Sequence, residues 1–338
     1  MRDFLRMSKY AAGYLTMASL SRYLCKSNMV NYFQSVLYRT TGAGINIISL
    51  VSPHWSTARL MRLFSVPPKP LIRPKEMAFL QTAKQIKAKY GNADVMEYHW
   101  GSERHPLVLL SYGWGYNAGR WRHFTEELLA AGFRIIAFDP PGHGLLPPAQ
   151  INLVVNAKII QGLLEKYGPA EVMIGHSFGG ASGVFALQNT ARHLHPKRMV
   201  LMASFSHTPT VLKSFADRLG LWAFTFDRMI EAFEKYSGFP ITKFDQALMC
   251  ANLSHIQGLI VHSPGDEVTP FNNAVRYHNF WKNSYLYAPK TGGHHLGTAT
   301  VTAAVVHFTI SGSVPPDAQL EEKPSAADHE LISYYPGS

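Results

Sequence analysis

Cysteine, charge and long apolar runs are all scarce in this sequence. The 338 residues include two cysteines, Cys25 and Cys250, which lie far apart. Such a pair offers neither a disulfide framework nor the close spacing of a zinc site, and it favours a reducing compartment. A membrane-spanning helix needs about 18–20 consecutive apolar residues, and no stretch is that long. These absences predict a soluble, cytoplasmic protein with no metal and no cofactor.

Signs of disorder and of repetition are missing too. Charged residues make up 16% of the chain, low-complexity tracts are absent, and no segment recurs at a fixed period. This excludes a disordered chain and a solenoid of repeats. With 46% hydrophobic and 12% aromatic residues, the chain can bury a full core, as one large domain with an insertion or as two smaller domains.

Positive charge is concentrated near the N-terminus. Residues 1–90 contain 14 Lys and Arg against two acids, Asp3 and Glu76, whereas the other 248 residues contain 18 basic and 20 acidic groups. The basic segment fits a solvated or docking surface, and it also fits a weak contact with an anionic membrane surface. Because no nucleic-acid-binding motif accompanies the charge, we expect no nucleic-acid partner.

The pattern divides the chain into three segments. Residues 1–75 read as a basic, partly helical N-terminal extension that ends in a proline-rich connection. Residues 76–312 alternate between apolar runs and amphipathic stretches, and residues 313–338 read as a loose C-terminal tail. Strands that alternate with helices of ten or more residues predict a mostly parallel sheet with helices on both faces. The expected strands are 94–100, 107–111, 134–138, 171–175, 198–203, 258–262 and 285–288, and the expected helices are 76–90, 121–131, 153–167, 179–191 and 301–310.

The alternation breaks in the middle of the chain. Residues 205–255 show an amphipathic helical pattern instead, which predicts a small helical cap inserted after the strand 198–203. Its aromatic residues Trp222, Phe224 and Phe226 have two interpretations. They pack the cap onto the sheet, or they contact an apolar acyl or aromatic substrate.

The strongest chemical signal is a Gly-x-Ser-x-Gly motif. Gly175-His176-Ser177-Phe178-Gly179 follows an apolar strand and precedes a predicted helix. A serine on such a tight strand-to-helix turn is exposed as a nucleophile, and the helix directs its N-terminal amides at the reaction centre. The glycines on either side avoid steric overlap at the turn. The motif predicts Ser177 as a catalytic nucleophile.

From these residues onward the sequence resembles the α/β-hydrolase superfamily, in its serine-esterase-like branch with a short helical cap. The resemblance covers roughly residues 76–312. It implies an α/β-hydrolase fold and brings in a second motif, Ser111-Tyr112-Gly113-Trp114-Gly115. By the resemblance, the backbone N–H groups of Trp114 and Phe178 form the oxyanion hole. The chain departs from the family at Tyr112, where a histidine is usual.

Two further motifs supply the remaining catalytic groups by the same resemblance. The turn that contains Asp266 implies that this carboxylate orients the catalytic base, and the loop Thr291–Gly297 implies that His294 is that base. His295 is adjacent and stays an alternative. The order serine, aspartate, histidine is that of α/β-hydrolases. A further turn, Asp139–Gly144, includes His143, and we expect it to shape the site without a catalytic role.

These residues predict acyl transfer on a small-molecule substrate. His294 takes the Ser177 proton, Ser177 attacks a carbonyl carbon of an ester or thioester, and water releases the acid from the acyl-enzyme. A serine acyltransferase and a hydrolase of carbon–carbon bonds stay open on the same fold. In a different class, the chain could be a non-catalytic binding protein that has kept this fold.

Overall fold

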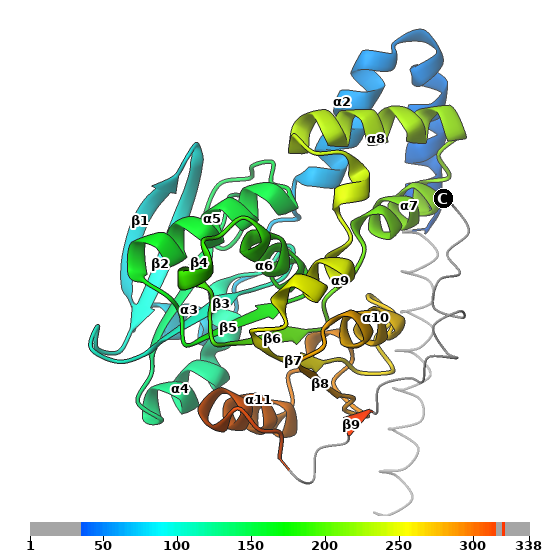
Figure 1. Cartoon of the computed structure of the whole chain (residues 1–338). Coiled ribbons are helices and arrows are strands. Elements are labelled where there is room, and N and C mark those ends of the chain that lie inside the picture. The colour runs from blue at the N-terminus through cyan, green and yellow to red at the C-terminus, as the bar shows by residue number, and fades with distance from the viewer. Residues whose placement is uncertain (1–34, 316–319, 322–338) are drawn as a thin grey trace, which may run out of the picture. The chain divides into compact units, whose positions relative to one another are not determined.

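The computed structural model of the chain describes residues 35–315 and 320–321. They fall into two compact units, one made of residues 35–60 and 212–232 and the other of 61–211, 233–315 and 320–321 (Figure 1). Residues 1–34 of the expected N-terminal extension, and most of the expected tail, lie outside the described residues. No helix in the described part of the chain combines the length and the apolar character needed to cross a membrane.

A nine-stranded, mostly parallel sheet forms the framework of the larger unit. Its strand order is β1-β2-β4-β3-β5-β6-β7-β8-β9. The pairs from β4 through β3, β5, β6 and β7 to β8 are parallel, whereas β1–β2, β2–β4 and β8–β9 are antiparallel. The strands are β1 Lys84–Tyr90, β2 Ala93–Trp100, β3 Leu107–Ser111, β4 Arg134–Asp139, β5 Val172–His176, β6 Arg198–Met202, β7 Gln257–Val261, β8 Ser284–Tyr287 and β9 Leu320–Glu321.

Helices cover both faces of this sheet, which confirms the predicted α/β class with a mostly parallel sheet. Figure 1 shows α4 and α11 on one face, and α5 and α6 on the other. Residues 35–51 are helical as well. The α-helices after them are α2 Pro53–Ser65, α3 Pro74–Leu80, α4 Arg122–Ala130, α5 Leu153–Tyr167, α6 Phe178–Gln188, α7 Thr208–Leu219, α8 Ala223–Ser237, α9 Gln246–Met249, α10 Asn272–Phe280 and α11 Ala299–Ser311.

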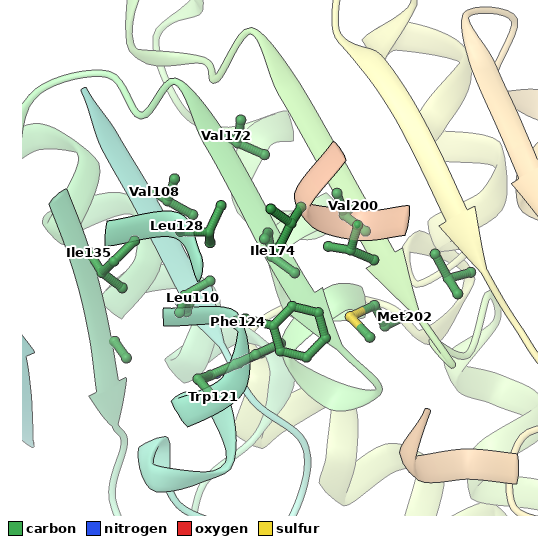
Figure 2. Close-up of a cluster of buried hydrophobic side chains, with 14 of the residues drawn as sticks. Val108, Leu110, Trp121, Phe124, Leu128, Ile135, Val172, Ile174, Val200 and Met202 are labelled. Carbon is green, nitrogen blue, oxygen red and sulfur yellow. The ribbon is translucent and has the colours of Figure 1, made fainter. Parts of the chain in front are cut away.

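The main hydrophobic core fills the space between one sheet face and two helices. Alternate residues of the central strands point to this face, because side chains change sides at every residue along a strand. They pack on Phe124 and Leu128 of α4 and on Val301 and Val305 of α11 (Figure 2). The parallel strands β3, β5 and β6 are almost completely buried, as continuous apolar runs predict.

One sequence-based expectation about secondary structure is wrong, and one helix has no counterpart among the expectations. Residues 76–90 do not form one helix, because the chain ends α3 at Leu80 and then forms the edge strand β1. Lys, Gln and Ala give β1 a helical propensity, but antiparallel pairing of all seven residues with β2 overrides it. The side chains of the resulting strand alternate in exposure. Helix α10, on residues 272–280, was not expected, because its sequence is polar overall.

In the smaller unit, residues 35–51 pack closely on the C-terminal end of α7 and on the residues that follow it. A side chain at Gly42 would lie 1.8 Å from the carbonyl oxygen of Leu219, so only glycine permits this approach. Asn46 donates to the Gly220 carbonyl at 2.9 Å and accepts from the Trp222 amide at 3.0 Å. Trp222 and Phe224, the aromatic residues expected in the cap, are 45% and 37% exposed.

Candidate active site

Ser177 lies on a strained turn between β5 and α6. Its φ of 50° and ψ of −118° are rare for a residue with a side chain. The Ser177 amide donates to the Met202 carbonyl at 2.8 Å, and its own carbonyl accepts from Ser204 Oγ at 3.0 Å. These bonds hold the strained residue in place. Its residue surface is partly exposed, while His176 and Phe178 on either side are buried.

The two motif glycines are required because backbone lies against them. A Cβ on Gly175 would be 2.5 Å from the Cα of Gly180, and a Cβ on Gly179 would be 2.3 Å from the carbonyl oxygen of Ser111. Both distances are far below normal van der Waals contact. The small residues of the motif therefore allow α6 to begin directly against β5 and β3, with the serine at the vertex.

Asp266 and His294 meet by a direct hydrogen bond. His294 Nδ1 lies 2.9 Å from Asp266 Oδ2, across 28 residues of chain. Asp266 follows β7, and His294 lies in a short 3₁₀ turn, Gly293–His295, after β8. An Nδ1–H that donates to the carboxylate leaves Nε2 as the basic nitrogen. His295 is exposed and its Nε2 lies 3.2 Å from Tyr116 Oη, so it contacts a different partner.

The Asp266 carboxylate is buried and fully hydrogen-bonded. Its Oδ1 accepts from the amides of Val268 and Thr269 at 2.8 and 2.9 Å, and its Oδ2 lies 3.2 Å from Nε2 of a second histidine, His262. Burial by itself raises the pKa of Asp266, but the hydrogen bonds from His262, His294 and the Thr269 amide hold it well below its usual range. The acid is therefore ionised at neutral pH.

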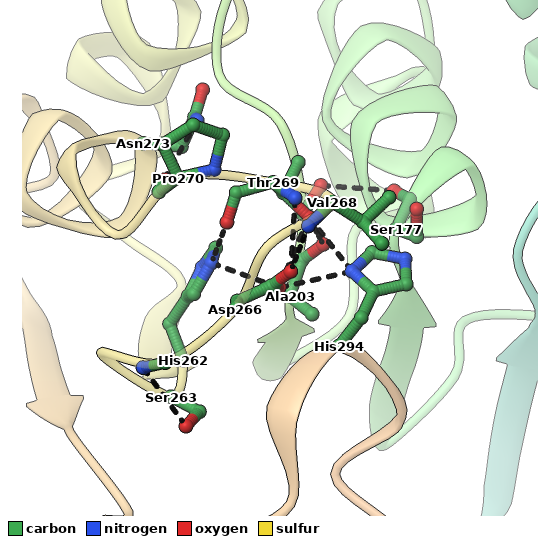
Figure 3. A network of polar contacts seen from close by, with 12 residues as sticks. Ser177, Ala203, His262, Ser263, Asp266, Val268, Thr269, Pro270, Asn273 and His294 are labelled. Atoms are coloured by element: carbon green, nitrogen blue, oxygen red, sulfur yellow. Dashed lines mark hydrogen bonds and ion pairs between the residues drawn. The ribbon is translucent and has the colours of Figure 1, made fainter. Parts of the chain in front are cut away.

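Sequence reasoning missed two residues that complete this network (Figure 3). Thr269 Oγ1 lies 2.8 Å from His294 Nδ1, 3.1 Å from Asp266 Oδ2 and 3.0 Å from the Ala203 carbonyl. His262 is buried, and its Nε2 also lies 2.8 Å from the Thr269 carbonyl. Both lie in the turn that identified Asp266, so the signal was a histidine four positions before the acid and a threonine three positions after it.

Ser177 and His294 come together without a hydrogen bond between them. In Figure 3 the His294 ring lies between Asp266 and Ser177. His176, which precedes the serine, directs Nε2 at the His294 carbonyl oxygen 2.8 Å away. Burial lowers the pKa of His176 to about 3, so this ring is neutral and its single N–H is the donor. Among the described residues Ser177 Oγ has no hydrogen bond to His294.

The two backbone amides expected in the oxyanion hole belong to neighbouring residues. The rings of Trp114 and Phe178 pack edge to face with centroids 5.1 Å apart. Gly113, just before Trp114, approaches Ser177 so closely that a Cβ there would be 3.2 Å from the serine Cβ. Phe178 is the first residue of α6, where amides have no partner within the helix. Within the described chain neither the Trp114 amide nor the Phe178 amide donates a hydrogen bond, so both could donate to a substrate oxygen.

His143 fixes the loop that carries Trp114. Its Nδ1 donates to the Pro141 carbonyl at 3.0 Å, and its Nε2 accepts from the Gly115 amide at 3.1 Å. Burial lowers the pKa of His143 to about 4, so the ring stays neutral and can accept at Nε2. Nearby Asp139 is buried, accepts from the Ala118 amide at 2.7 Å, and has its pKa raised by burial to about 7. These contacts are structural and lie outside the Asp266–His294 pair.

Comparison with known proteins places this geometry in a family context. A family model described as the alpha/beta hydrolase fold matches residues 106–295. Over 122 residues the chain is 36% identical to the 2-hydroxy-6-oxononadienedioate/2-hydroxy-6-oxononatrienedioate hydrolase 1 of Dechloromonas aromatica, covering 33% of this chain and 42% of that protein. Over 125 residues it is 31% identical to protein phosphatase methylesterase 1 of Mus musculus, covering 35% and 31%.

A solved structure with the same fold is the monoacylglycerol lipase of Paleococcus ferrophilus. Its TM-score is 0.51 at 21% identity, and the match covers 65% of this chain and 99% of the lipase. At that identity the likeness concerns the fold alone. The sequence matches to the Dechloromonas hydrolase and to the methylesterase span less than half the length of those two proteins.

Proposed function

Because the chain belongs to the α/β-hydrolase fold family, we propose that it is a serine hydrolase that cleaves a carboxylic ester or thioester through an acyl-enzyme on Ser177. The observation that carries the proposal is the Asp266–His294 hydrogen bond of 2.9 Å beside a serine held at a φ of 50°. A nucleophile on a strained turn next to an oriented imidazole is the arrangement that acyl transfer needs.

In the first step His294 Nε2 accepts the Ser177 hydroxyl proton while Oγ attacks the carbonyl carbon. The Asp266 carboxylate holds the imidazole in the Nδ1–H tautomer and stabilises the imidazolium that forms. The Trp114 and Phe178 amides donate to the oxyanion, a contribution of about 3–4 kcal/mol for one donor in comparable enzymes. The imidazolium then gives its proton to the leaving group, and the acyl-enzyme remains.

In the second step the same histidine removes a proton from water, which attacks the acyl-enzyme carbonyl. The acid leaves, and Ser177 regains its proton from the imidazolium. We propose that this chemistry takes place in the cytoplasm, since a chain with two distant cysteines suits a reducing compartment.

A second candidate reaction is supported by one comparison. The Dechloromonas relative is named for hydrolysis of a 2-hydroxy-6-oxo dicarboxylic compound, and it is the more similar of the two relatives by identity. The same serine, histidine and aspartate could act on the carbonyl of such a compound. This candidate differs from the first in its substrate and in the bond that is broken.

The test is a panel of p-nitrophenyl esters, acyl thioesters and a 2-hydroxy-6-oxo dienedioate, assayed with the wild-type chain and with Ser177→Ala. We expect turnover of at least one class by the wild type and a loss of about 10⁴-fold or more in the variant. A fluorophosphonate probe should label the wild type alone. A Ser177→Ala variant that melts like the wild type and still turns over the substrate at the wild-type rate would refute the assignment.

A further inference from the structure

A cavity of about 170 Å³ lies next to the loop that carries His294. Neither Ser177 nor His294 lines it, although their chain neighbours His176 and His295 both do. The cavity is therefore separate from the reacting groups and yet adjacent to them. All of its lining residues belong to the larger unit.

The lining of this cavity is strongly positive. It includes three arginines, Arg73, Arg120 and Arg122, together with three histidines, and it contains no aspartate or glutamate. Arg120 Nε lies 3.0 Å from Oε1 of the buried Glu76. Within residues 35–315 the other two arginines form no ion pair. Within the described chain Arg73 and Arg122 therefore line one small cavity without an ion pair of their own, and the Glu76 carboxylate beside it pairs with Arg120.

Part of the cavity lining is aromatic and apolar. Tyr112 stacks on His176 with ring centroids 4.6 Å apart, and Trp121 packs on Phe124 at 5.5 Å. Trp121 and Phe124 are drawn in Figure 2 beside Met202, which also lines the cavity. Apolar side chains in the lining lower the local dielectric constant, and this strengthens the interaction between a bound charge and the arginines.

The positive charge of these arginines also affects the pKa of His295, another lining residue. The pKa of this imidazole is lowered by burial first, and then by the neighbouring charges of His294, Arg120 and Arg73. A site that disfavours a further positive charge favours a negative one. Arginine is also the side chain whose paired N–H donors match carboxylate and phosphate oxygens.

We infer that this cavity binds a small anion, the carboxylate or phosphate group of a ligand, held by Arg73 and Arg122. Arg120 adds positive charge from the wall, where Glu76 keeps it in place. The cavity is too small for more than such a group and a few attached atoms, so the rest of a larger ligand would extend outward.

The walls of this site also hold the His294 loop. The Arg120 guanidinium lies 4.7 Å over the Tyr116 ring, and the Tyr116 hydroxyl is 3.2 Å from His295 Nε2. On the other side, His176 Nε2 is 2.8 Å from the His294 carbonyl. A bound anion therefore contacts groups that support the loop from two directions, independently of whether the hydrolase reaction takes place.

The experiment is isothermal titration calorimetry of the full chain with sodium phosphate and, separately, with sodium acetate, with ionic strength held constant by sodium chloride. The test variant is Arg73→Gln with Arg122→Gln, which leaves the buried Arg120–Glu76 pair intact. The matched control is Arg104→Gln. Arg104 is exposed and precedes β3, whereas Tyr112 of the cavity lining follows β3, so the two lie at opposite ends of that strand. We expect binding by the wild type and the control, and affinity at least tenfold weaker in the double variant.

The pattern of anions identifies the ligand group. Binding of phosphate alone assigns the site to a phosphate group, binding of acetate alone to a carboxylate, and binding of both to either. If neither anion binds the wild type, or if the double variant binds as tightly as the control, the inference is overturned. Should the double variant fail to fold by circular dichroism, Arg122→Gln alone decides, with an expected loss of at least threefold.

Discussion

Two buried carboxylates in the larger unit each bond an imidazole, and their surroundings differ. Glu97 Oε2 on β2 lies 2.8 Å from His99 Nε2 and accepts from the Tyr167 hydroxyl at 2.6 Å, while Oε1 accepts from the Tyr90 hydroxyl at 2.7 Å. Asp266 bonds His294 at 2.9 Å, in the loops that follow the parallel strands, beside Ser177. The two carboxylate–imidazole pairs are nearly equal in length.

The electrostatic state of the two acids is also similar. Burial raises the pKa of Glu97, but hydrogen bonds from His99, Tyr167 and Tyr90 lower it to about 2. The pKa of Asp266 is likewise lowered by its hydrogen bonds. A buried, ionised carboxylate with an imidazole partner is therefore no mark of catalysis by itself. The difference is the strained serine next to His294, which His99 lacks among its contacts in the described chain.

The largest expected effect separates the two histidines. His294→Ala should lower kcat for the best ester by about 10⁴–10⁶-fold, because it removes the proposed base. The matched change His99→Ala should leave kcat within about twofold, since it lies outside the proposed site. Steady-state kinetics of both variants measures this. Equal losses of kcat in the two variants would contradict the assignment of His294, and not His99, as the catalytic base.

The next effect separates the two acids. Asp266→Asn should lower kcat by about 10⁴-fold, because an amide no longer holds the required imidazole tautomer. Glu97→Gln should keep kcat and lower the free energy of unfolding by about 3 kcal/mol, because the Gln NH2 group replaces one carboxylate oxygen and meets the two donors that bonded it. Urea denaturation and ester kinetics on the same samples check both. An Asp266→Asn variant with wild-type kcat would remove this carboxylate from the mechanism.

A smaller effect concerns acid stability. A carboxylate with a lowered folded-state pKa stabilises the fold fully above its unfolded value and loses this contribution as pH falls. For Glu97 the loss runs from about pH 4.5 down to about pH 2 and amounts to roughly 2 kcal/mol after allowance for solvent screening. Urea midpoints of the wild type should therefore fall more steeply in this window than those of Glu97→Gln. Parallel curves would contradict the role given to Glu97.

The smallest effect concerns the neighbouring histidine. His295→Ala should lower kcat/KM by less than about tenfold, because it removes only a partly exposed bond to the Tyr116 hydroxyl. A loss as large as that of His294→Ala would make His295 the base. Measuring both variants with one substrate sharpens the contrast between an imidazole bonded to the acid and one bonded to a tyrosine.

Most of the sheet could be predicted from the sequence because its central strands are buried on both faces. Continuous apolar runs at β3, β5 and β6 predicted strands within one or two residues of their ends. The edge strand β1 carries no such signal, since its identity depends on pairing with β2. Local propensity favoured a helix there, whereas antiparallel pairing with β2 across the short turn at residues 91–92 makes it a strand.

The proposed site was predictable in part for a related reason. Ser177, Asp266 and His294 lie in glycine-containing turns whose spacing is visible in the chain. The roles of Thr269 and His262 depend on how one turn folds back on itself, so that both reach the same Asp266 oxygen. Likewise, the support that His176 gives to the His294 loop joins residues 118 positions apart.

The alternating exposure of β1 has a consequence for the behaviour of the protein at high concentration. Lys84, Lys87 and Lys89 are exposed along the free edge of the sheet. A strand from a second copy that paired with this edge would have to approach these charged side chains and desolvate them, which disfavours edge-to-edge extension of the sheet. The lysines, two of which also pair with Glu103 and Asp94, thus disfavour pairing of a further strand at this edge, and acetylation of all three would remove their charge while leaving the pairing groups of the edge unchanged.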